Sequence, residues 1–191
     1  MTILFNAEPL VRALLPELMK TALSREPDFE VFRDGRRDEV YLRRWWMVPR
    51  NDQCNIYLHN MLADDDEILH DHMYESWSLI LTDGLEERFV SAPEKLHDEK
   101  FSAGFPPAAY QHRALRAGDV VYRSERMAHQ LLVRAPAWTL FATGPRVKEW
   151  GFWCRRGKRH WKEYVALTQD PSVQGGHKQE SGRGVGCGEM S

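Results

Sequence analysis

Short segments in which apolar and polar residues alternate dominate the chain from residue 39 onward. They cover residues 39–48, 55–62, 76–82, 85–90, 109–116, 120–123, 129–134 and 138–144, with a further edge strand at 149–154. Asp83-Gly84 is a strong hairpin dipeptide, and residues 91–108 read as a loop because they contain three prolines. Closely spaced strands without intervening helices predict an antiparallel sandwich or barrel, and they exclude a doubly wound sheet.

A helical period marks the N-terminus instead. Leu10, Leu14, Leu15 and Leu18 form one apolar stripe, which predicts a helix over residues 6–25. We expect this helix to pack on the sheet; a partner-binding helix is the alternative. Residues 169–191 are rich in Gly, Ser and Gln and predict a flexible tail. The chain thus divides into an N-terminal helical segment (1–38), an all-β barrel domain (39–168) and the tail (169–191).

Composition narrows the classes of function. The chain has 191 residues, 42% of them hydrophobic, and a net charge of −2, so we expect one globular domain that does not bind nucleic acid. We find no apolar run of membrane-spanning length and no signal peptide, and therefore expect no membrane association. The three cysteines, Cys54, Cys154 and Cys187, form no CxxC pair. We expect free thiols and a cytoplasmic location.

Histidines form the clearest chemical pattern. His70 and His72 flank a single residue, and in an extended segment such side chains point to the same face. Two imidazoles on an inward face can bind one divalent metal ion, for which iron, zinc, copper and nickel are suitable. A third ligand must come from another segment, and His129, which opens an apolar strand, is the best candidate.

The segment from Gly118 to His129 resembles the second motif of the cupin superfamily, in which a Gly precedes a metal-binding His by eleven residues. Ser124 and Arg126 stand where that motif has Pro and a second Gly. The first cupin motif, HxH followed by Glu and then Gly, is matched by His70, His72 and Gly84. The resemblance covers about residues 40–145 and extends to an uncharacterised group of bacterial and phage cupins. It implies a double-stranded β-helix, the jelly-roll barrel, with a metal bound by these three histidines.

The glutamate of the first cupin motif is missing. Ser76 and Trp77 occupy its two expected positions, and Glu75 falls one residue short, on the opposite face by strand parity. A bulge after His72 is the alternative that would let Glu75 reach the metal. A site of three histidines resembles that of the thiol dioxygenases, cupins that use iron(II) without a carboxylate ligand. It also suits zinc with a bound water. We therefore expect a divalent metal ion, Fe(II) in preference to Zn.

Several other polar residues are candidates for roles beside the metal. His112 and Tyr122 are the candidate catalytic acid or base, and a surface or core role is the alternative for His112. Alternation places His59 on one face with Tyr57, where it could line the cavity. Arg123 and Arg146 could hold an anionic substrate. Other basic residues, with Arg43 and Arg44 among them, read as solvated surface.

The pattern favours a metal-dependent enzyme that acts on a small molecule, with iron(II) oxygenase chemistry as the first hypothesis. The alternative is a non-enzymatic cupin that binds or senses a small molecule, and a third hypothesis is a metal that only stabilises the fold. Cupins host all of these functions, so the fold does not choose among them. The aromatic strand at 39–48 could also pair along its edge into a homodimer, although its arginines oppose such pairing.

Overall fold

The computed structural model describes residues 3–32, 40–93, 110–154, 157–168, 179–183 and 187. Its elements are β1 (Ile3–Asn6), α1 (Glu8–Ser24), β2 (Phe29–Phe32), β3 (Val40–Trp46), β4 (Asn55–Met61), β5 (His70–Asp71), β6 (Ser76–Ile80), β7 (Leu85–Val90), β8 (Gln111–Leu115), β9 (Asp119–Arg123), β10 (Ala128–Val133), β11 (Ala137–Thr143), β12 (Gly151–Cys154), β13 (Gly157–His160), α3 (Trp161–Tyr164), β14 (Val165–Thr168) and β15 (Gln179–Arg183). Within these residues, no helix has the length and apolar character needed to cross a membrane.

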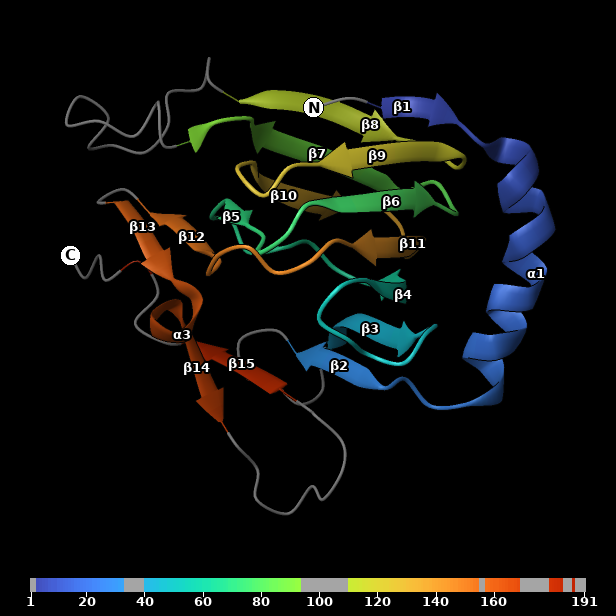
Figure 1. Cartoon of the computed structure of the whole chain (residues 1–191), viewed down its shortest axis with the longest axis horizontal. Coiled ribbons are helices and arrows are strands. Elements are labelled where there is room, and N and C mark those ends of the chain that lie inside the picture. Colours follow the sequence, from blue (N-terminus) through green and yellow to red (C-terminus); the bar gives the residue numbers. More distant parts are fainter. Residues whose placement is uncertain are drawn as a thin grey trace.

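The described strands form two sheets, of nine strands in the order β1-β9-β6-β11-β4-β3-β2-β15-β14 and of six in the order β13-β12-β5-β10-β7-β8. Eight central strands pair in a nested way: β4 with β11, β5 with β10, β6 with β9, and β7 with β8, all antiparallel. One long hairpin rolled into two facing sheets produces this order, which is the jelly roll. Figure 1 shows the two sheets along the length of their strands.

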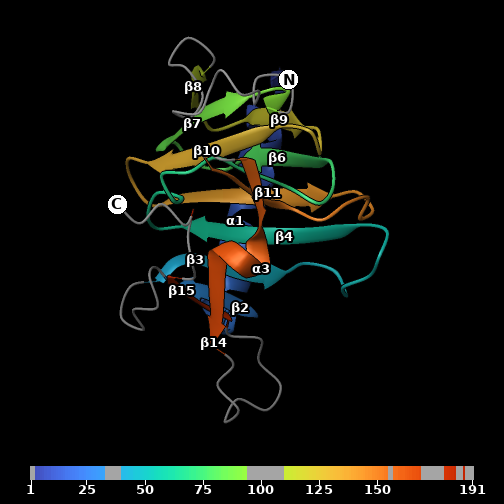
Figure 2. The same cartoon turned by 90° about the vertical axis from the view of Figure 1, so that its left-hand side faces the viewer.

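Strict alternation along these strands separates an interior from an outer layer. The inward positions at one end of the barrel are apolar and form a core of Leu42, Met61, Ile80, Leu85, Leu115, Val121 and Ala137. The outward face of the nine-stranded sheet packs instead on α1, where Trp45, Leu58 and Leu79 meet Val11 and Leu18. The helix runs across the strands in Figure 1, and Figure 2 places it on the side opposite α3. The N-terminal helix therefore covers a sheet face, as its apolar stripe predicts.

Two turns of the barrel require glycine. Gly84 has a φ of 112°, and a Cβ there would lie 2.8 Å from the carbonyl oxygen of Ala135. Gly118 has a φ of 92°, and a Cβ there would lie 2.7 Å from the side chain of Asn6. Both φ values lie in the region that favours glycine. These are the two glycines that the cupin motifs predict, so the motif spacing reflects turn geometry as well as ligand position.

The predicted fold class, an all-β jelly roll with an N-terminal helix, is confirmed, and each of the nine predicted strand segments contains a strand. The sequence pattern did not predict β1, β2, β13, β14 or β15, and it placed His70 and His72 in an extended segment without naming the short strand β5. The predicted loop at 91–108 lies mostly outside the described residues. β15 falls inside the predicted flexible tail yet pairs with β14 and β2. The boundaries of the three segments, 1–38, 39–168 and 169–191, remain predictions.

Two expectations need correction. Cys154 and Cys187 form a disulfide, with their Cα atoms 5.4 Å apart, while Cys54 is free and exposed. The fold brings together two cysteines 33 residues apart, which no local spacing reveals. The aromatic strand β3 is also not an edge, because it pairs with both β2 and β4. A homodimer thus remains a prediction without this strand as its basis, and the cytoplasmic location is likewise untested.

Candidate metal centre

Three histidines from separate turns of the barrel meet inside it. His70 lies on β5, His72 follows that strand, and His129 lies on β10 directly opposite His70 in the antiparallel register. The ligand nitrogens of the three lie within 4.8 Å of one another. Their ring centroids are separated by 4.8 to 5.2 Å. The structure thus brings together all three residues that the sequence predicts as metal ligands.

Asp71 holds the short strand β5 in the orientation that points both of its neighbouring histidines inward. The Asp71 carboxylate is fully buried and accepts hydrogen bonds from Lys148 Nζ at 2.5 Å and from the Gly151 backbone at 2.8 Å. Lys158 Nζ lies 2.7 Å from the same carboxylate. A two-residue strand has few ladder bonds of its own, so these contacts supply the anchoring. The His-Asp-His pattern is therefore two candidate metal ligands on either side of one structural residue.

Glu87 on β7 is a site residue that the sequence analysis missed. Its fully buried carboxylate lies 2.6 Å from His129 Nδ1. It also accepts hydrogen bonds from Arg123 Nε at 2.7 Å and from Arg113 Nε at 2.8 Å. Arg123 in turn donates to Ser78 Oγ at 2.7 Å. A signal for Glu87 was present, because it shares the inward parity of Leu85 and Phe89, and a charge at such a position needs partners.

This network determines the protonation of the cluster. Burial alone would raise the pKa of Glu87, but the charge of Arg123 and the hydrogen bond with His129 outweigh it and hold that pKa well below its usual value. The ionised carboxylate can only accept a hydrogen bond, so His129 Nδ1 carries the proton of this contact, and Nε2 is the nitrogen that faces the other histidines. His72 Nε2 lies 2.8 Å from His129 Nε2, so one proton is shared between these two nitrogens.

The donor set fits a divalent metal ion. Burial lowers the pKa of His70 to about 4 and that of His72 well below its usual value, so both rings are neutral, the form that binds a metal. Metal–imidazole bonds of about 2.1 Å place two bound nitrogens roughly 3.0 to 3.4 Å apart. His72 and His129 thus need only a shift of a few tenths of an ångström, with the proton between their Nε2 atoms displaced. Ser76, where the family has Glu, has a buried Oγ without a partner among the described residues.

An aromatic wall adjoins the three histidines. The His72 ring stacks on Tyr74 at 5.9 Å and lies 6.1 Å from Phe141, between ring centroids. Phe141 also contacts His59 at 5.1 Å and Tyr57 at 6.3 Å. Tyr57 and His59 thus share the inward face, as their alternation predicts. Such a wall excludes water from one side of the cluster.

Arg44 is half-buried and lies on the inward face of its strand, whereas the sequence-based interpretation placed it on a solvated surface. Its guanidinium lies 4.8 Å from the Tyr57 ring centroid and 5.6 Å from that of Phe29, and its Nε donates to His59 Nε2 at 2.8 Å. Arg44 has the inward parity of Leu42, which lies in the barrel core. The expectation missed these contacts because it weighed the local run of basic residues and not the parity of the strand.

The remaining predicted site residues lie elsewhere. His112 is exposed on β8, and Tyr122 contacts Trp77 on the outward face of its sheet. Glu75 accepts a hydrogen bond from Tyr122 at 2.7 Å, which raises the pKa of Tyr122 to about 12. The structure does not bring these residues to the three histidines. Arg123, a candidate for holding an anionic substrate, is already paired with Glu87.

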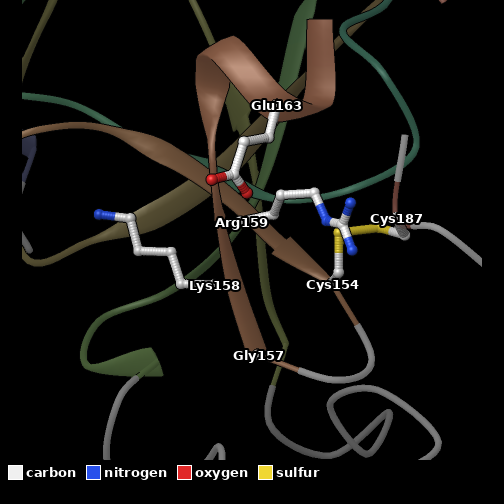
Figure 3. A pocket seen from close by; sticks show the side chains of 6 residues that line it. All are labelled: Cys154, Gly157, Lys158, Arg159, Glu163 and Cys187. Atoms are coloured by element: carbon white, nitrogen blue, oxygen red, sulfur yellow. A yellow bond between two sulfur atoms is a disulfide. The ribbon is translucent and has the colours of Figure 1, made fainter. Parts of the chain in front are cut away.

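Arg146 likewise forms an exposed ion pair with Glu149. A separate hollow surrounds the disulfide (Figure 3). Its lining consists of Cys154, Gly157, Lys158, Arg159, Glu163 and Cys187. None of the three clustered histidines is among these residues, so the hollow is distinct from the candidate metal centre.

Comparisons with known proteins give weak likenesses. No family model and no curated protein matches the chain. Among solved structures, a cupin superfamily protein of Desulfitobacterium hafniense DCB-2 is 14% identical over 55% of this chain and 77% of its own, with a TM-score of 0.37. KdgF of a Halomonas species is 13% identical over 56% of this chain and 82% of its own, with a TM-score of 0.39. Streptomyces albus HEPD, with Fe(II) and substrate bound, is 12% identical over 58% of this chain and 22% of its own, with a TM-score of 0.42.

At such scores the likenesses carry no weight of their own, and the fold follows from the strand order. The nested pairing of β4 to β11 encloses His70, His72 and His129 at the positions that the two sequence motifs predict. The chain has the jelly-roll fold implied by its resemblance to the cupins, with three histidines gathered inside the barrel.

Proposed function

We propose that the chain is a metal-dependent enzyme that acts on a small molecule, with ferrous iron bound by His70, His72 and His129. The observation that carries the proposal is the convergence of three imidazoles from β5, its following turn and β10, with their ligand nitrogens within 4.8 Å of one another. Structural metal sites are closed by four protein ligands, whereas catalytic sites keep positions open for substrate. Three nitrogens without a carboxylate match the open type.

The chain's own residues define what such a site does. Ferrous iron, when bound, supplies the chemistry of oxygen activation, to which imidazole ligands are suited. Glu87 holds the Nδ1 proton of His129 at 2.6 Å and so directs Nε2 toward the centre. Phe141 and Tyr74 cover one side of the cluster and limit the access of water to it.

The ordered partners of His129 favour an enzyme over a purely structural metal. Glu87, Arg113, Arg123 and Ser78 form a hydrogen-bonded network that is connected inside the barrel without any metal. The apolar core at the other end of the barrel is likewise independent of the histidines. We therefore expect the metal-free chain to remain folded, whereas a chain stabilised by its metal would unfold on chelation.

The metal content of the full chain tests the proposal. We would purify the protein anaerobically and measure bound metal by elemental mass spectrometry, beside a His129→Ala variant and a His160→Ala control. His160 is a partly exposed histidine that contacts Glu149 and lies outside the cluster. We expect about one iron per chain in the wild type and in the control, and loss of the metal in His129→Ala with an unchanged circular dichroism spectrum.

A wild-type chain that neither contains a metal nor takes up iron or zinc on titration would refute the proposed site. Stoichiometric zinc that iron cannot replace would refute the ferrous part of the proposal. An iron-loaded chain that consumes no oxygen with any member of a small-molecule library would favour the binding or sensing alternative.

A further inference from the structure

Arg44 has an unusual position for an arginine of this chain. It lies on β3 opposite His59 of β4 and is sandwiched between the rings of Phe29 and Tyr57. Its side chain therefore extends along the inward face of the barrel, where the low-polarity surroundings strengthen any charge interaction. A guanidinium ordered by aromatic faces loses little freedom when it binds a further group.

The hydrogen-bonding capacity of Arg44 is largely unused. Nε donates to His59 Nε2 at 2.8 Å, but the two Nη nitrogens have no hydrogen-bond partner and no carboxylate among the described residues. The neighbouring Arg43 points the other way and pairs with Glu30 at 3.0 Å. Arg123, also inward, is paired with Glu87 at 2.7 Å. Arg44 is thus an inward cation without an anionic partner among the described residues.

The contact with Arg44 also fixes the tautomer of His59. An arginine can only donate, so His59 Nε2 must accept, and the proton of the neutral ring lies on Nδ1. Burial, together with the charge of Arg44, holds the pKa of His59 well below its usual value and keeps the ring neutral. Nδ1 has no hydrogen-bond partner among the described residues. Arg44 and His59 therefore both have donors to spare, and neither has an acceptor to spare.

This pair lies beside the candidate metal centre. The His59 ring contacts one side of Phe141, with 5.1 Å between centroids, and the His72 ring contacts the same phenylalanine at 6.1 Å. One aromatic side chain therefore separates the unused donors from the metal ligands, which is a distance that a small molecule spans.

We propose that Arg44 and His59 form an oxyanion subsite that binds the carboxylate or phosphoryl group of the substrate. This inference rests on the proposed function, because it takes the barrel interior at the three histidines to be the reaction site. Paired N–H donors of a guanidinium match two oxygens of either group, and the Nδ1–H of His59 adds a third donor. A cation or a group that only donates hydrogen bonds finds no acceptor on this pair. The substrate class is therefore a small organic anion.

Anion binding to the metal-free full chain tests the subsite apart from the metal. We would titrate chelated protein with propionate, methylphosphonate and the neutral propionamide by isothermal titration calorimetry. The variants are Arg44→Gln and, as a matched control on the same strand, Arg43→Gln. We expect the wild type and Arg43→Gln to bind one of the anions with affinities within twofold of each other, and Arg44→Gln to bind it at least tenfold more weakly. The preferred anion identifies the carboxylate or the phosphoryl group.

Imidazole nitrogen NMR supplies a readout that does not depend on affinity. We expect the His59 ring of the wild type to carry its proton on Nδ1, and the Nδ1 resonance to shift when the anion is added. An Nε2-protonated His59, equal binding of propionamide and propionate, or equal anion binding by Arg44→Gln would each overturn the proposal. If Arg44→Gln does not fold, Arg44→Lys takes its place, with a reduced affinity expected because lysine lacks the paired donors.

The metal content of the same samples separates the two proposals. An Arg44→Gln chain that keeps its metal but loses the anion supports the subsite. A wild-type chain that binds the anion but no metal would refute the proposed function and leave the anion-binding pair standing. A wild-type chain that binds the metal but neither anion would refute the subsite alone.

Discussion

Replacement of Glu87 by glutamine tests how the barrel holds His129. The fully buried carboxylate receives donors from Arg123 at 2.7 Å, from Arg113 at 2.8 Å and from His129 at 2.6 Å. Glutamine keeps the shape of the side chain, but it loses the negative charge and points an NH₂ group at residues that can only donate. Removal of one partner from a buried ion pair costs about 3–5 kcal/mol in the free energy of unfolding.

The structure favours the lower end of that range. The Arg113 side chain is 13% exposed and can turn toward water, whereas that of Arg123 is 3% exposed and cannot. Because only one arginine is left buried without a counter-charge, we expect the free energy of unfolding to fall by about 3 kcal/mol. With a urea dependence of about 2 kcal/mol per molar, the unfolding midpoint falls by roughly 1.5 M. The affinity of the three histidines for metal falls by about 10- to 100-fold, because His129 loses the acceptor that orients it.

Urea unfolding of the metal-free chain and a competitive metal titration measure these two effects. Glu86→Gln is the matched control, because Glu86 lies on the same strand with the opposite parity and forms an exposed pair with Arg134. We expect Glu86→Gln to leave both the midpoint and the metal affinity unchanged. A Glu87→Gln chain as stable as the wild type, with undiminished metal affinity, would show that the carboxylate neither neutralises the arginines nor orients His129.

Three further predictions follow from other parts of the fold. Gly84→Ala should lower the free energy of unfolding by more than about 1 kcal/mol, because Gly84 has a φ of 112°. Gly144 has no positive φ, so Gly144→Ala should lower the free energy of unfolding by less, and urea unfolding compares the two variants. Cys187→Ser should lower stability by about 3–4 kcal/mol, the value for a closed loop of about 33 residues, and Cys54→Ser should not; thermal melts with and without a dithiol reductant check this. The free energy of unfolding of the metal-free chain should fall as the pH drops below about 6.5, because His59 binds a proton in the unfolded chain but stays neutral when buried. Measured as urea unfolding against pH, His59→Gln should lose less stability on acidification than the wild type, and an equal loss would contradict the lowered pKa of His59.

Much of the fold could be predicted because its signals are local. The alternation in β4, β6, β7 and β11, the Asp83-Gly84 turn and the stripe of α1 each depend on residues close in sequence. The strands β1 and β2 lacked such signals: each has four residues and is defined by its partner strand. The disulfide depends in the same way on the arrangement of distant segments. Short strands and cysteine pairs depend on the assembled sheet, so local sequence patterns do not predict them.

The residues of the candidate site likewise differ in how far local sequence predicts them. His70, His72 and His129 could be predicted because two motifs fix their spacing. Glu87 and Arg44 have inward parity that is visible in the sequence, but their meaning depends on the strand opposite: His59 faces Arg44 in the register, and Arg123 reaches Glu87 from the other sheet. Parity shows that a side chain enters the barrel, and only the cross-strand register shows what it meets there.

The nested pairing of the barrel has a consequence for its synthesis. Strands β4, β5 and β6 pair with β11, β10 and β9 in reverse order, so the partner of the earliest strand is made last. His72 leaves the ribosome 57 residues before His129, which corresponds to about 3 to 11 s at ordinary elongation rates. During that interval the nascent chain exposes two histidines and unpaired strand edges, and the complete ligand set forms only when β10 closes the roll. Because such long-range contacts also form slowly, we expect the proposed metal to bind after translation, once the barrel has closed.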